Sequence, residues 1–326
     1  MGSLNNGQHI SQNDKVVRHV GKSIVMSTLS NDLKLTEKFE LSYSDKIKQL
    51  EDSIKGISSR VVWLDASDSS TVDVENGRVT EWRDKTSNGI AADDSDLGAG
   101  NSPQLVSIDA GGVTRSALYF DSNDISLSLG SQLNDHVTGE GKNFTIVFAI
   151  KPNGLSGNGD IVDIINKWND SHSTFYIYME DNDVWGTFAI EMYANDNLSN
   201  GIKVFGNEHL TNDKVYIVTI SYDESAGDDT DRVTKYLNRT DDKHPLSWSY
   251  GAGLNDSLGS NDDPLTIGKH SGSDFSGYRG SFTGHMYEII IFNEVLSETN
   301  RALVEHYLGL KWNATKHMAD LRTGAG

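Results

Sequence analysis

Closely spaced carboxyl groups are the residues of this sequence with the clearest capacity for chemistry. Asp181 and Asp183 form one pair, and Asp228, Asp229 and Asp231 form a second group. Two carboxyl groups about 5 Å apart can hydrolyse a glycosidic bond with retention. Both groups lie in segments rich in Asn, Gly and Asp, however, and such segments are typical of solvated turns.

Other catalytic motifs are missing from the sequence. There is no Gly-x-Ser-x-Gly elbow, no His-Glu-x-x-His pair and no Gly-rich phosphate loop, and the ten His are scattered. The chain has no Cys, which excludes thiolate nucleophiles, Fe–S clusters and Cys-ligated zinc. We therefore expect a protein that is not an enzyme, with a glycoside hydrolase as the remote alternative.

A calcium site is the metal chemistry that the acidic loops allow. The segment from Asp181 through Asp183 begins like an EF-hand loop. It departs from that pattern at Trp185 and at Met192, where a bidentate Glu is needed. No cofactor is required by any motif, and at most one Ca²⁺ is expected, with Asp181 and Asp183 as its candidate ligands.

Aromatic side chains between loops are the candidates for sugar binding, because a sugar site needs ring faces and a few fixed polar groups. The candidates are Trp168, Tyr176, Tyr178, Trp185, Trp248 and Tyr250. Tyr176 and Tyr178 are two residues apart, so they share one face of the strand expected over 174–179. Packing in the core or between subunits is the alternative role for each of these rings.

Overall composition narrows the choice of partners. The chain has 326 residues and a net charge of −19. So acidic a protein does not neutralise phosphates, and we expect no nucleic-acid partner and no docking on an anionic membrane. No apolar run approaches the 18 residues of a membrane span, so no membrane insertion is expected.

The first 60 residues differ in kind from the rest. They are slightly basic and poor in aromatic residues, whereas all six Trp lie after them. Residues 1–42 are expected to be an arm that is either disordered or ordered by a partner. A short helix is expected over 43–58, with a heptad seam formed by Tyr43, Ile47, Leu50, Ile54 and Ile57. Two readings stay open: the helix bundles with copies of itself, or it packs on its own domain.

From residue 61 onward the pattern is that of short strands separated by turn clusters. The segment 143–151 alternates with period two and places Phe144, Ile146 and Phe148 on one face. Segments 174–179, 187–193, 214–222 and 285–292 are similar, and together they predict an all-β sandwich or barrel. A helix near the C-terminus is predicted to begin after Ser297 as its cap and to stop at Gly309.

Three stretches resemble the LamG-like family, the laminin-G type 3 or concanavalin A-like jelly rolls. The first is Val62-Trp-Leu-Asp-Ala-Ser-Asp-Ser-Ser-Thr-Val72 with Gly77-Arg-Val-Thr-Glu-Trp-Arg-Asp-Lys-Thr-Ser-Asn-Gly89. The second is Pro103-Gln-Leu followed by Leu118-Tyr-Phe-Asp121. The third runs from Tyr287-Glu-Ile-Ile-Ile-Phe-Asn-Glu-Val-Leu-Ser-Glu-Thr-Asn-Arg301 to Lys311-Trp312.

This resemblance covers residues 61–313 and implies a concanavalin A-like jelly-roll β-sandwich with a short C-terminal helix, followed by a tail over 314–326. Trp63, Trp82 and Trp312 are then expected in the core, and Asp65 and Asp84 are expected to accept hydrogen bonds from turn N–H groups. The Glu-x-Asp-x-x-Glu pattern of jelly-roll glucanases does not occur.

The layout of arm, helix and jelly roll is common in structural proteins of tailed bacteriophages. The sequence opens without a secretory signal. We therefore expect a virion protein, either a tail-fibre or receptor-binding component or a head decoration or fibre protein. Residues 1–60 would contact other virion proteins or further copies of the chain, as in a trimer, and the jelly roll would contact host-surface polysaccharide or neighbouring virion proteins. The alternative is a free bacterial lectin or adhesin, located outside the cell or on its surface.

Overall fold

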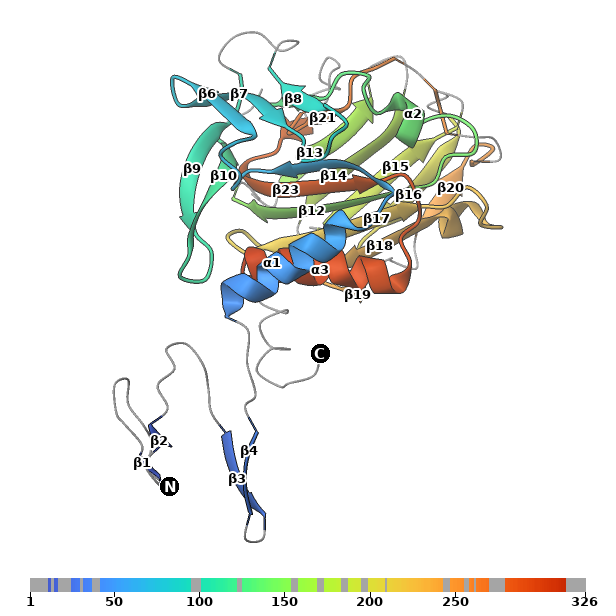
Figure 1. Cartoon of the computed structure of the whole chain (residues 1–326). Helices are drawn as coiled ribbons and strands as arrows, with labels where there is room; N and C mark the ends of the chain where they lie inside the picture. Colours follow the sequence, from blue (N-terminus) through green and yellow to red (C-terminus); the bar gives the residue numbers. More distant parts are fainter. Residues whose placement is uncertain are drawn as a thin grey trace. The chain divides into compact units, whose positions relative to one another are not determined.

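The structure is a computed structural model of the chain, and it divides into two compact units, Met1–Ser53 and Ile54–Gly326 (Figure 1). The described residues are 11–12, 15–16, 25–29, 32–36, 42–94, 101–121, 125–153, 158–168, 173–182, 187–194, 199–208, 210–242, 247–254, 258–260, 262–269 and 279–314.

In the first unit, the described part of the expected arm contains two short hairpins. β1 (Ser11–Gln12) pairs with β2 (Lys15–Val16), and β3 (Val25–Leu29) pairs with β4 (Asp32–Thr36). The predicted helix follows as α1 (Tyr43–Lys55), which ends three residues earlier than expected. Ser42 caps it, because its hydroxyl accepts a hydrogen bond from the Asp45 N–H at 3.2 Å.

The second unit is an antiparallel β-sandwich, which confirms the predicted all-β class. Its first sheet contains β18 (Val233–Leu237), β17 (Tyr216–Tyr222), β12 (Phe144–Pro152), β23 (Gly284–Phe292) and β5 (Arg60–Asp65), hydrogen-bonded in that order. Every residue of β17 is buried, because both faces of this sheet are covered.

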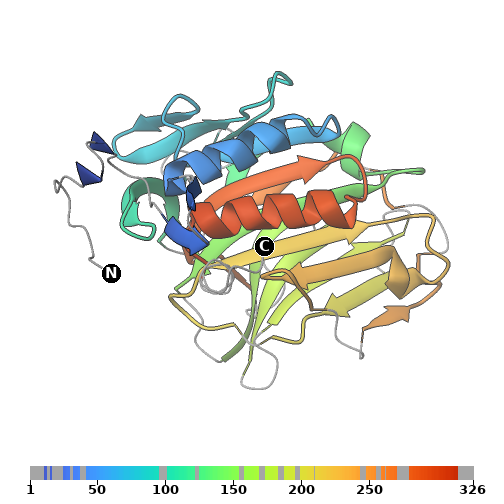
Figure 2. The ribbon, with the colours of Figure 1, turned by 60° about the horizontal axis from the view of Figure 1, so that its bottom comes forward.

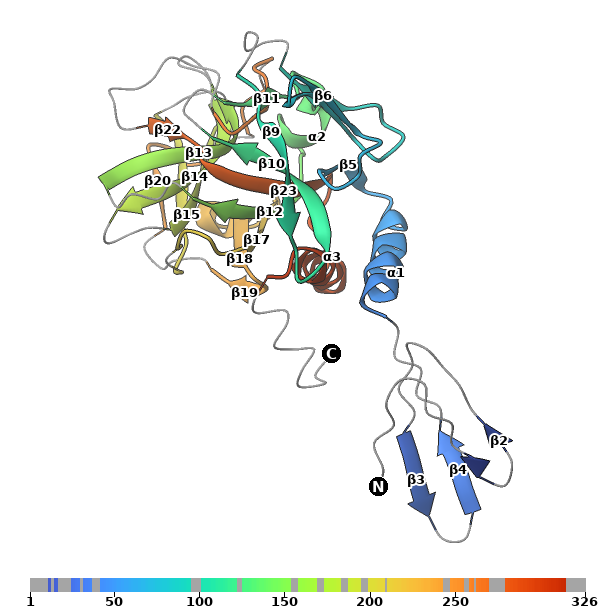
Figure 3. The ribbon, with the colours of Figure 1, turned by 90° about the vertical axis from the view of Figure 1, so that its left-hand side faces the viewer.

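The second sheet contains β13 (Asn158–Trp168), β14 (Ser173–Asn182), β15 (Thr187–Tyr193), β16 (Gly201–Phe205) and β20 (Trp248–Tyr250), also in hydrogen-bonded order. In Figure 3 these strands are seen on the far side of the sandwich from the helix α3. This sheet carries the candidate site described below.

Short strands connect the two sheets at one edge of the sandwich. They are β6 (Val72–Glu75), β7 (Arg78–Arg83), β8 (Ala91–Asp93), β9 (Gln104–Asp109), β10 (Thr114–Phe120), β11 (Leu127–Ser128), β21 (Thr266–Ile267) and β22 (Arg279–Ser281). A chain of pairings runs from β10 beside β23, through β9, β7, β8 and β11, to β21 beside β13. The remaining elements are β19 (Thr240–Asp241), α2 (Asn134–Val137) and the single turn η1 (Asp229–Arg232).

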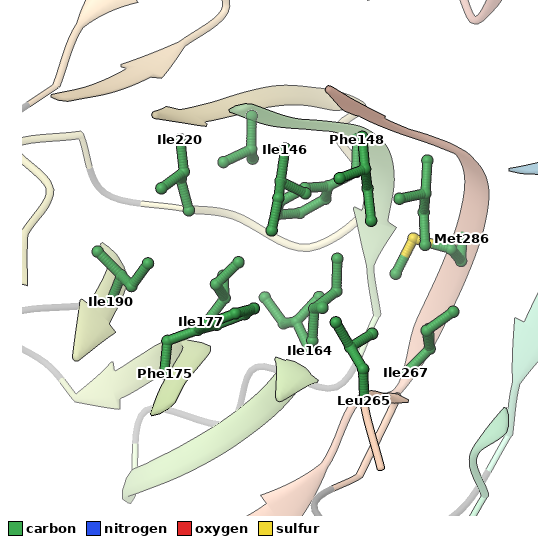
Figure 4. Packing of buried hydrophobic residues seen from close by; sticks show 14 of the residues in the cluster. Ile146, Phe148, Ile164, Phe175, Ile177, Ile190, Ile220, Leu265, Ile267 and Met286 are labelled. Carbon is green, nitrogen blue, oxygen red and sulfur yellow. The ribbon is translucent and has the colours of Figure 1, made fainter. Parts of the chain in front are cut away.

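The core lies between the two sheets. Phe148 of β12 and Ile220 of β17 meet Phe175 and Ile177 of β14 in one continuous apolar cluster (Figure 4). The face predicted for segment 143–151 is therefore the one that is buried in the core. Because these side chains alternate with the other face of each strand, the core fixes which residues point outward.

The C-terminal helix α3 (Glu298–Lys311) packs on the outside of the first sheet, against β12 and β17 (Figure 2). Ser297 caps it as predicted, since its hydroxyl accepts from the Asn300 N–H at 3.2 Å. The predicted stop at Gly309 is wrong. Gly309 is buried and helical, and the helix continues to Lys311 because the contacts made by Lys311 hold its last turn in place.

Those contacts form a buried polar network around Glu288 of β23. Its carboxylate accepts hydrogen bonds from Trp63 Nε1 at 2.5 Å, Tyr307 Oη at 2.9 Å and Trp312 Nε1 at 2.8 Å. The Lys311 ammonium lies 2.8 Å from Glu288 and 2.7 Å from Asp65. All three predicted tryptophan anchors are buried, with Trp82 inside the main core cluster.

Electrostatics in this network differ between its two acids. Burial opposes ionisation of Asp65, but the ammonium groups of Lys311 and Lys85 outweigh it and hold the Asp65 pKa well below its usual range. Burial and the nearby Asp65 raise the pKa of Glu288. Asp65 accepts a hydrogen bond from the turn N–H of Ser67 as predicted, whereas Asp84 accepts one from the N–H of Trp63 in strand β5. None of the helices among the described residues is long and apolar enough to cross a bilayer.

Candidate functional site

The candidate site lies on the side of the second sheet that faces away from the core. Phe175 and Ile177 of β14 belong to the main core, so Tyr176 and Tyr178 point to the other side. Directly opposite residues of antiparallel strands share a face, and the register therefore extends this surface across β13–β16. We call it the outer face: Ile161, Asp163, Asn166, Tyr176, Tyr178, Glu180, Thr187, Ala189, Glu191, Tyr193, Lys203 and Phe205.

One row of this face crosses four strands in register. Asn166 of β13 is opposite Tyr176 of β14, Tyr176 is opposite Glu191 of β15, and Glu191 is opposite Lys203 of β16. Neighbouring strands are about 4.8 Å apart, so the row is roughly 15 Å long. It therefore places an amide, an aromatic ring, a carboxylate and an ammonium along a line the length of a short oligosaccharide.

Three tyrosine rings lie next to each other on the outer face. Tyr176 stacks on Tyr178 with ring centroids 4.7 Å apart and an interplanar angle of 30°. Tyr176 also stacks on Tyr193 at 6.1 Å and 22°. These rings and Phe205 form an apolar cluster separate from the main core. They give the outer face an apolar surface next to its polar groups.

Lys203 joins the two glutamates of the face. Its ammonium lies 2.7 Å from Glu180 Oε1 and 3.2 Å from Glu191 Oε1. The Tyr178 hydroxyl donates to Glu191 at 3.1 Å, and the Tyr193 hydroxyl donates to it at 2.7 Å. Burial, together with the charge of Glu191, raises the pKa of Tyr178 well above its usual value. The phenol therefore stays protonated and acts as a hydrogen-bond donor to Glu191.

Two polar side chains of the outer face have no hydrogen-bond partner among the described residues. They are Asn166, through both its amide oxygen and its amide nitrogen, and Thr187, through its hydroxyl. Asn166 is 0% exposed and Thr187 is 2% exposed. Leaving such groups buried and unsatisfied costs about 1–3 kcal/mol each.

Solvent reaches the face at its charged end. The side chains of Lys203, Glu180 and Glu191 are 16%, 15% and 11% exposed. Tyr178 and Asn166 are both 0% exposed. The charged residues are therefore the part of this group that solvent reaches, and the amide and the Tyr178 ring are buried.

The aromatic residues predicted to bind sugar have different fates. Tyr176 and Tyr178 do share one face, and they are 3% and 0% exposed, so neither presents an open ring to solvent. Their packing fits the alternative role given above, and a role in sugar binding stays a prediction. The two rings are buried because they stack on each other and on Tyr193. Trp168 is the last residue of β13.

The remaining predicted residues are placed only through the backbone, or not at all. β20 pairs with β16 so that Trp248 is opposite Lys203, in line with the row described above, and Tyr250 is opposite Gly201. Trp185 and Asp183 lie outside the described residues. Asp181 lies in β14, opposite Asp160 of β13, and the calcium prediction stays a prediction. No group of three or more metal-ligating side chains occurs in the described parts of the chain.

The predicted oligomerisation seam is divided between the two units. Tyr43, Ile47 and Leu50 belong to the first unit. Ile54 belongs to the second and is 0% exposed, and Ile57 lies beyond the end of α1 and is 9% exposed. These two side chains are already buried in a single chain, and so is Ile47 at 7% exposure, so a seam between copies has to rest on Tyr43 and Leu50.

Sequence reasoning did not find Asn166, Thr187, Glu180, Glu191 or Lys203. These residues are separated along the chain, and no motif links them. They meet only because the strand register aligns them, and a sequence read alone does not give the register. The one available signal was the pair Tyr176 and Tyr178, which marked the correct face of β14.

Comparisons with known proteins agree with the fold. No protein-family model matches the sequence, and no curated protein matches it either. Among solved structures, the chain is similar to the binding domain of Paraclostridial Mosquitocidal Protein 1, with a TM-score of 0.51, 15% identity and coverage of 79% of this chain and 53% of that one. It is similar to Trypanosoma rangeli sialidase, with a TM-score of 0.50, 10% identity and coverage of 84% and 39%.

A third similar structure is the binding domain of botulinum neurotoxin serotype D, with a TM-score of 0.49, 13% identity and coverage of 76% and 50%. The chain thus spans about half the length of the two binding domains and 39% of the sialidase chain. At these identities the likeness concerns the fold. The chain is an antiparallel β-sandwich protein with one N-terminal and one C-terminal helix.

Proposed function

We propose that this chain is a non-enzymatic carbohydrate-binding protein, and that the outer face of β13–β16 is its saccharide site. The observation that carries the proposal is the buried amide of Asn166, which has no hydrogen-bond partner among the described residues. An Asn side chain offers both donors and an acceptor, so it can bind neighbouring hydroxyl groups of one sugar. The adjacent tyrosine rings pack on one another beside it, and the polar groups of the face that solvent reaches are Lys203, Glu180 and Glu191.

The wider setting proposed for the protein is a bacteriophage virion. In this proposal the jelly roll, which resembles the LamG-like family over residues 61–313, contacts host-surface glycan or a neighbouring virion protein. Residues 1–60 attach the chain to the particle or to further copies. The toxin binding domain that shares the fold supports a recognition role for such a sandwich, while its own ligand is not transferred to this chain.

A glycan array probed with the full chain tests the saccharide site. Specific binding to one class of saccharide is expected, and the Asn166→Ala variant should lose it. A second array in EDTA tests the calcium proposal, because loss of binding there would assign an ion to the acidic loops. If the full chain binds no saccharide on the array, a scaffold or decoration role replaces the proposed one.

Glycoside hydrolysis is the second candidate, because Glu180 and Glu191 lie on the same face and share Lys203. A hydrolase needs one carboxyl group that is protonated, to act as the acid. Release of reducing sugar by the full chain, abolished by Glu191→Gln, would support the hydrolase over the binding protein.

A further inference from the structure

The charges of the outer face suggest which saccharides it accepts. Within the described positions of β13–β16, the face carries the carboxyl groups of Asp163, Glu180 and Glu191, and Lys203 is its one cation. An acidic ligand bound on this face would therefore lie among carboxylates. Like charges placed next to each other weaken binding by more than about tenfold.

The one cation is already committed to the protein's own acids. The Lys203 ammonium contacts Glu180 at 2.7 Å and Glu191 at 3.2 Å, and it lies 4.7 Å from the centre of the Phe205 ring. To bind a ligand carboxylate, Lys203 would have to give up at least one of these contacts. It is therefore a poor receptor for the acid group of a sialic acid, a uronic acid or a sulfated sugar.

The other strong donors are also occupied. The hydroxyls of Tyr178 and Tyr193 both donate to Glu191. The groups that remain without partners among the described residues are the amide of Asn166 and the hydroxyl of Thr187. Both are neutral, and both can donate and accept, which matches the hydroxyl groups of a sugar rather than a negative charge.

We infer that the outer face selects uncharged, hydroxyl-rich saccharides and rejects acidic ones. This inference rests on the proposed function, since it concerns the ligand of the same site. It separates the chain from a receptor for sialylated or sulfated glycans, which would need a free cation at this place.

The test is a glycan array that presents each neutral oligosaccharide beside its sialylated, uronic acid and sulfated derivatives, probed with the full chain. Neutral members are expected to bind at least about tenfold more tightly than their acidic derivatives. Equal or tighter binding of acidic members would overturn the inference while the proposed function stands. An array without any bound saccharide would overturn both.

Variants separate the local charge from the overall charge of the chain. Glu180→Gln and Glu191→Gln keep the shape of each side chain and remove one negative charge, so each should bring the affinity for an acidic derivative closer to that for its neutral parent. Glu75→Gln is the matched control, because Glu75 is exposed on β6 and changes the net charge by the same amount. If all three variants shift the ratio equally, the selection is not made by the outer face.

Discussion

Asn166 and Thr187 are polar side chains in places where a folded sheet usually carries apolar ones. Each is at least 98% buried, and neither makes a hydrogen bond to the described residues. Their presence lowers the stability of the unliganded protein. A binding site is a setting in which such a cost is retained, because the same groups become satisfied when the ligand arrives.

Thr187→Val tests this reading through stability. Valine has nearly the same shape and no hydroxyl, so the free energy of unfolding should rise by about 1 kcal/mol in urea titrations. Thr145→Val is the matched control. The Thr145 hydroxyl contacts Ser221 and the backbone of Glu294 and Leu296, so this variant should lose about 1–3 kcal/mol. A loss of similar size in Thr187→Val would show that its hydroxyl is satisfied.

Lys235 gives a pH dependence with a definite sign. It is fully buried beside Asp242, and burial lowers its pKa to about 8 although Asp242 opposes the shift. Above pH 8 the folded chain releases this proton before the unfolded chain does, so Lys235 makes the protein more stable as the pH rises from about 8 to 10.

The measurement is urea unfolding at pH 8.0 and pH 9.5, in the wild type and in Lys235→Met. The wild type should gain up to about 2 kcal/mol relative to the variant across this interval. A wild-type profile parallel to that of the variant would mean that Lys235 titrates at its ordinary pKa.

At the scale of elements, the strands could be predicted from the sequence, but the pairing and register between strands could not. The alternation in segment 143–151 gave β12 and its core face, because a half-buried strand has to alternate. The same reasoning marked Tyr176 and Tyr178 as partners. It could not place Asn166 or Lys203 beside them, because register depends on pairings that are distant along the chain. The predicted helix end at Gly309 was wrong for a related reason. The helix continues to Lys311 because Lys311 contacts residues that are distant along the chain.

Helix α3 depends on the ammonium of Lys311, which links it to β5 and β23 through Asp65 and Glu288. Lys311→Met should lower the free energy of unfolding by about 3–5 kcal/mol, because it leaves the buried Glu288 without the cation that contacts it, while Asp65 keeps Lys85. Lys214→Met is the control, since Lys214 is exposed and its loss should change stability by less than about 0.5 kcal/mol. Urea unfolding measures both variants. Equal effects would show that the contacts of Lys311 with Asp65 and Glu288 do not stabilise the fold.

At the scale of the whole molecule, the chain joins a sandwich to a first unit of different composition. The LamG-like motifs predicted the sandwich, because they mark residues that its core requires. The heptad spacing does not predict assembly in the same way, since Ile54 and Ile57 of the heptad seam are buried within one chain. Ile47 is buried as well, so any seam between copies has to use Tyr43 and Leu50.

Light scattering of the full chain tests the proposed assembly. A trimer should have about three times the 35.8 kDa mass of one chain. Leu50→Glu should shift the mass toward that of one chain, because a charge in a helix seam is costly. Lys48→Glu is the control on the exposed side of α1 and should leave the mass unchanged. A full chain that has the mass of one copy would contradict the assembly proposal without affecting the saccharide site.

If Asn166 serves a saccharide rather than the fold, the Asn166→Leu variant should fold and fail to bind. Titration calorimetry of this variant with the saccharide selected on the array measures the binding. Leucine has a similar volume and no polar group, so the variant should unfold at about 1–3 kcal/mol higher free energy. Its affinity for the saccharide should fall at least about tenfold, which is the loss expected for a central hydrogen-bonding group. Unchanged affinity in a folded Asn166→Leu protein would contradict the account.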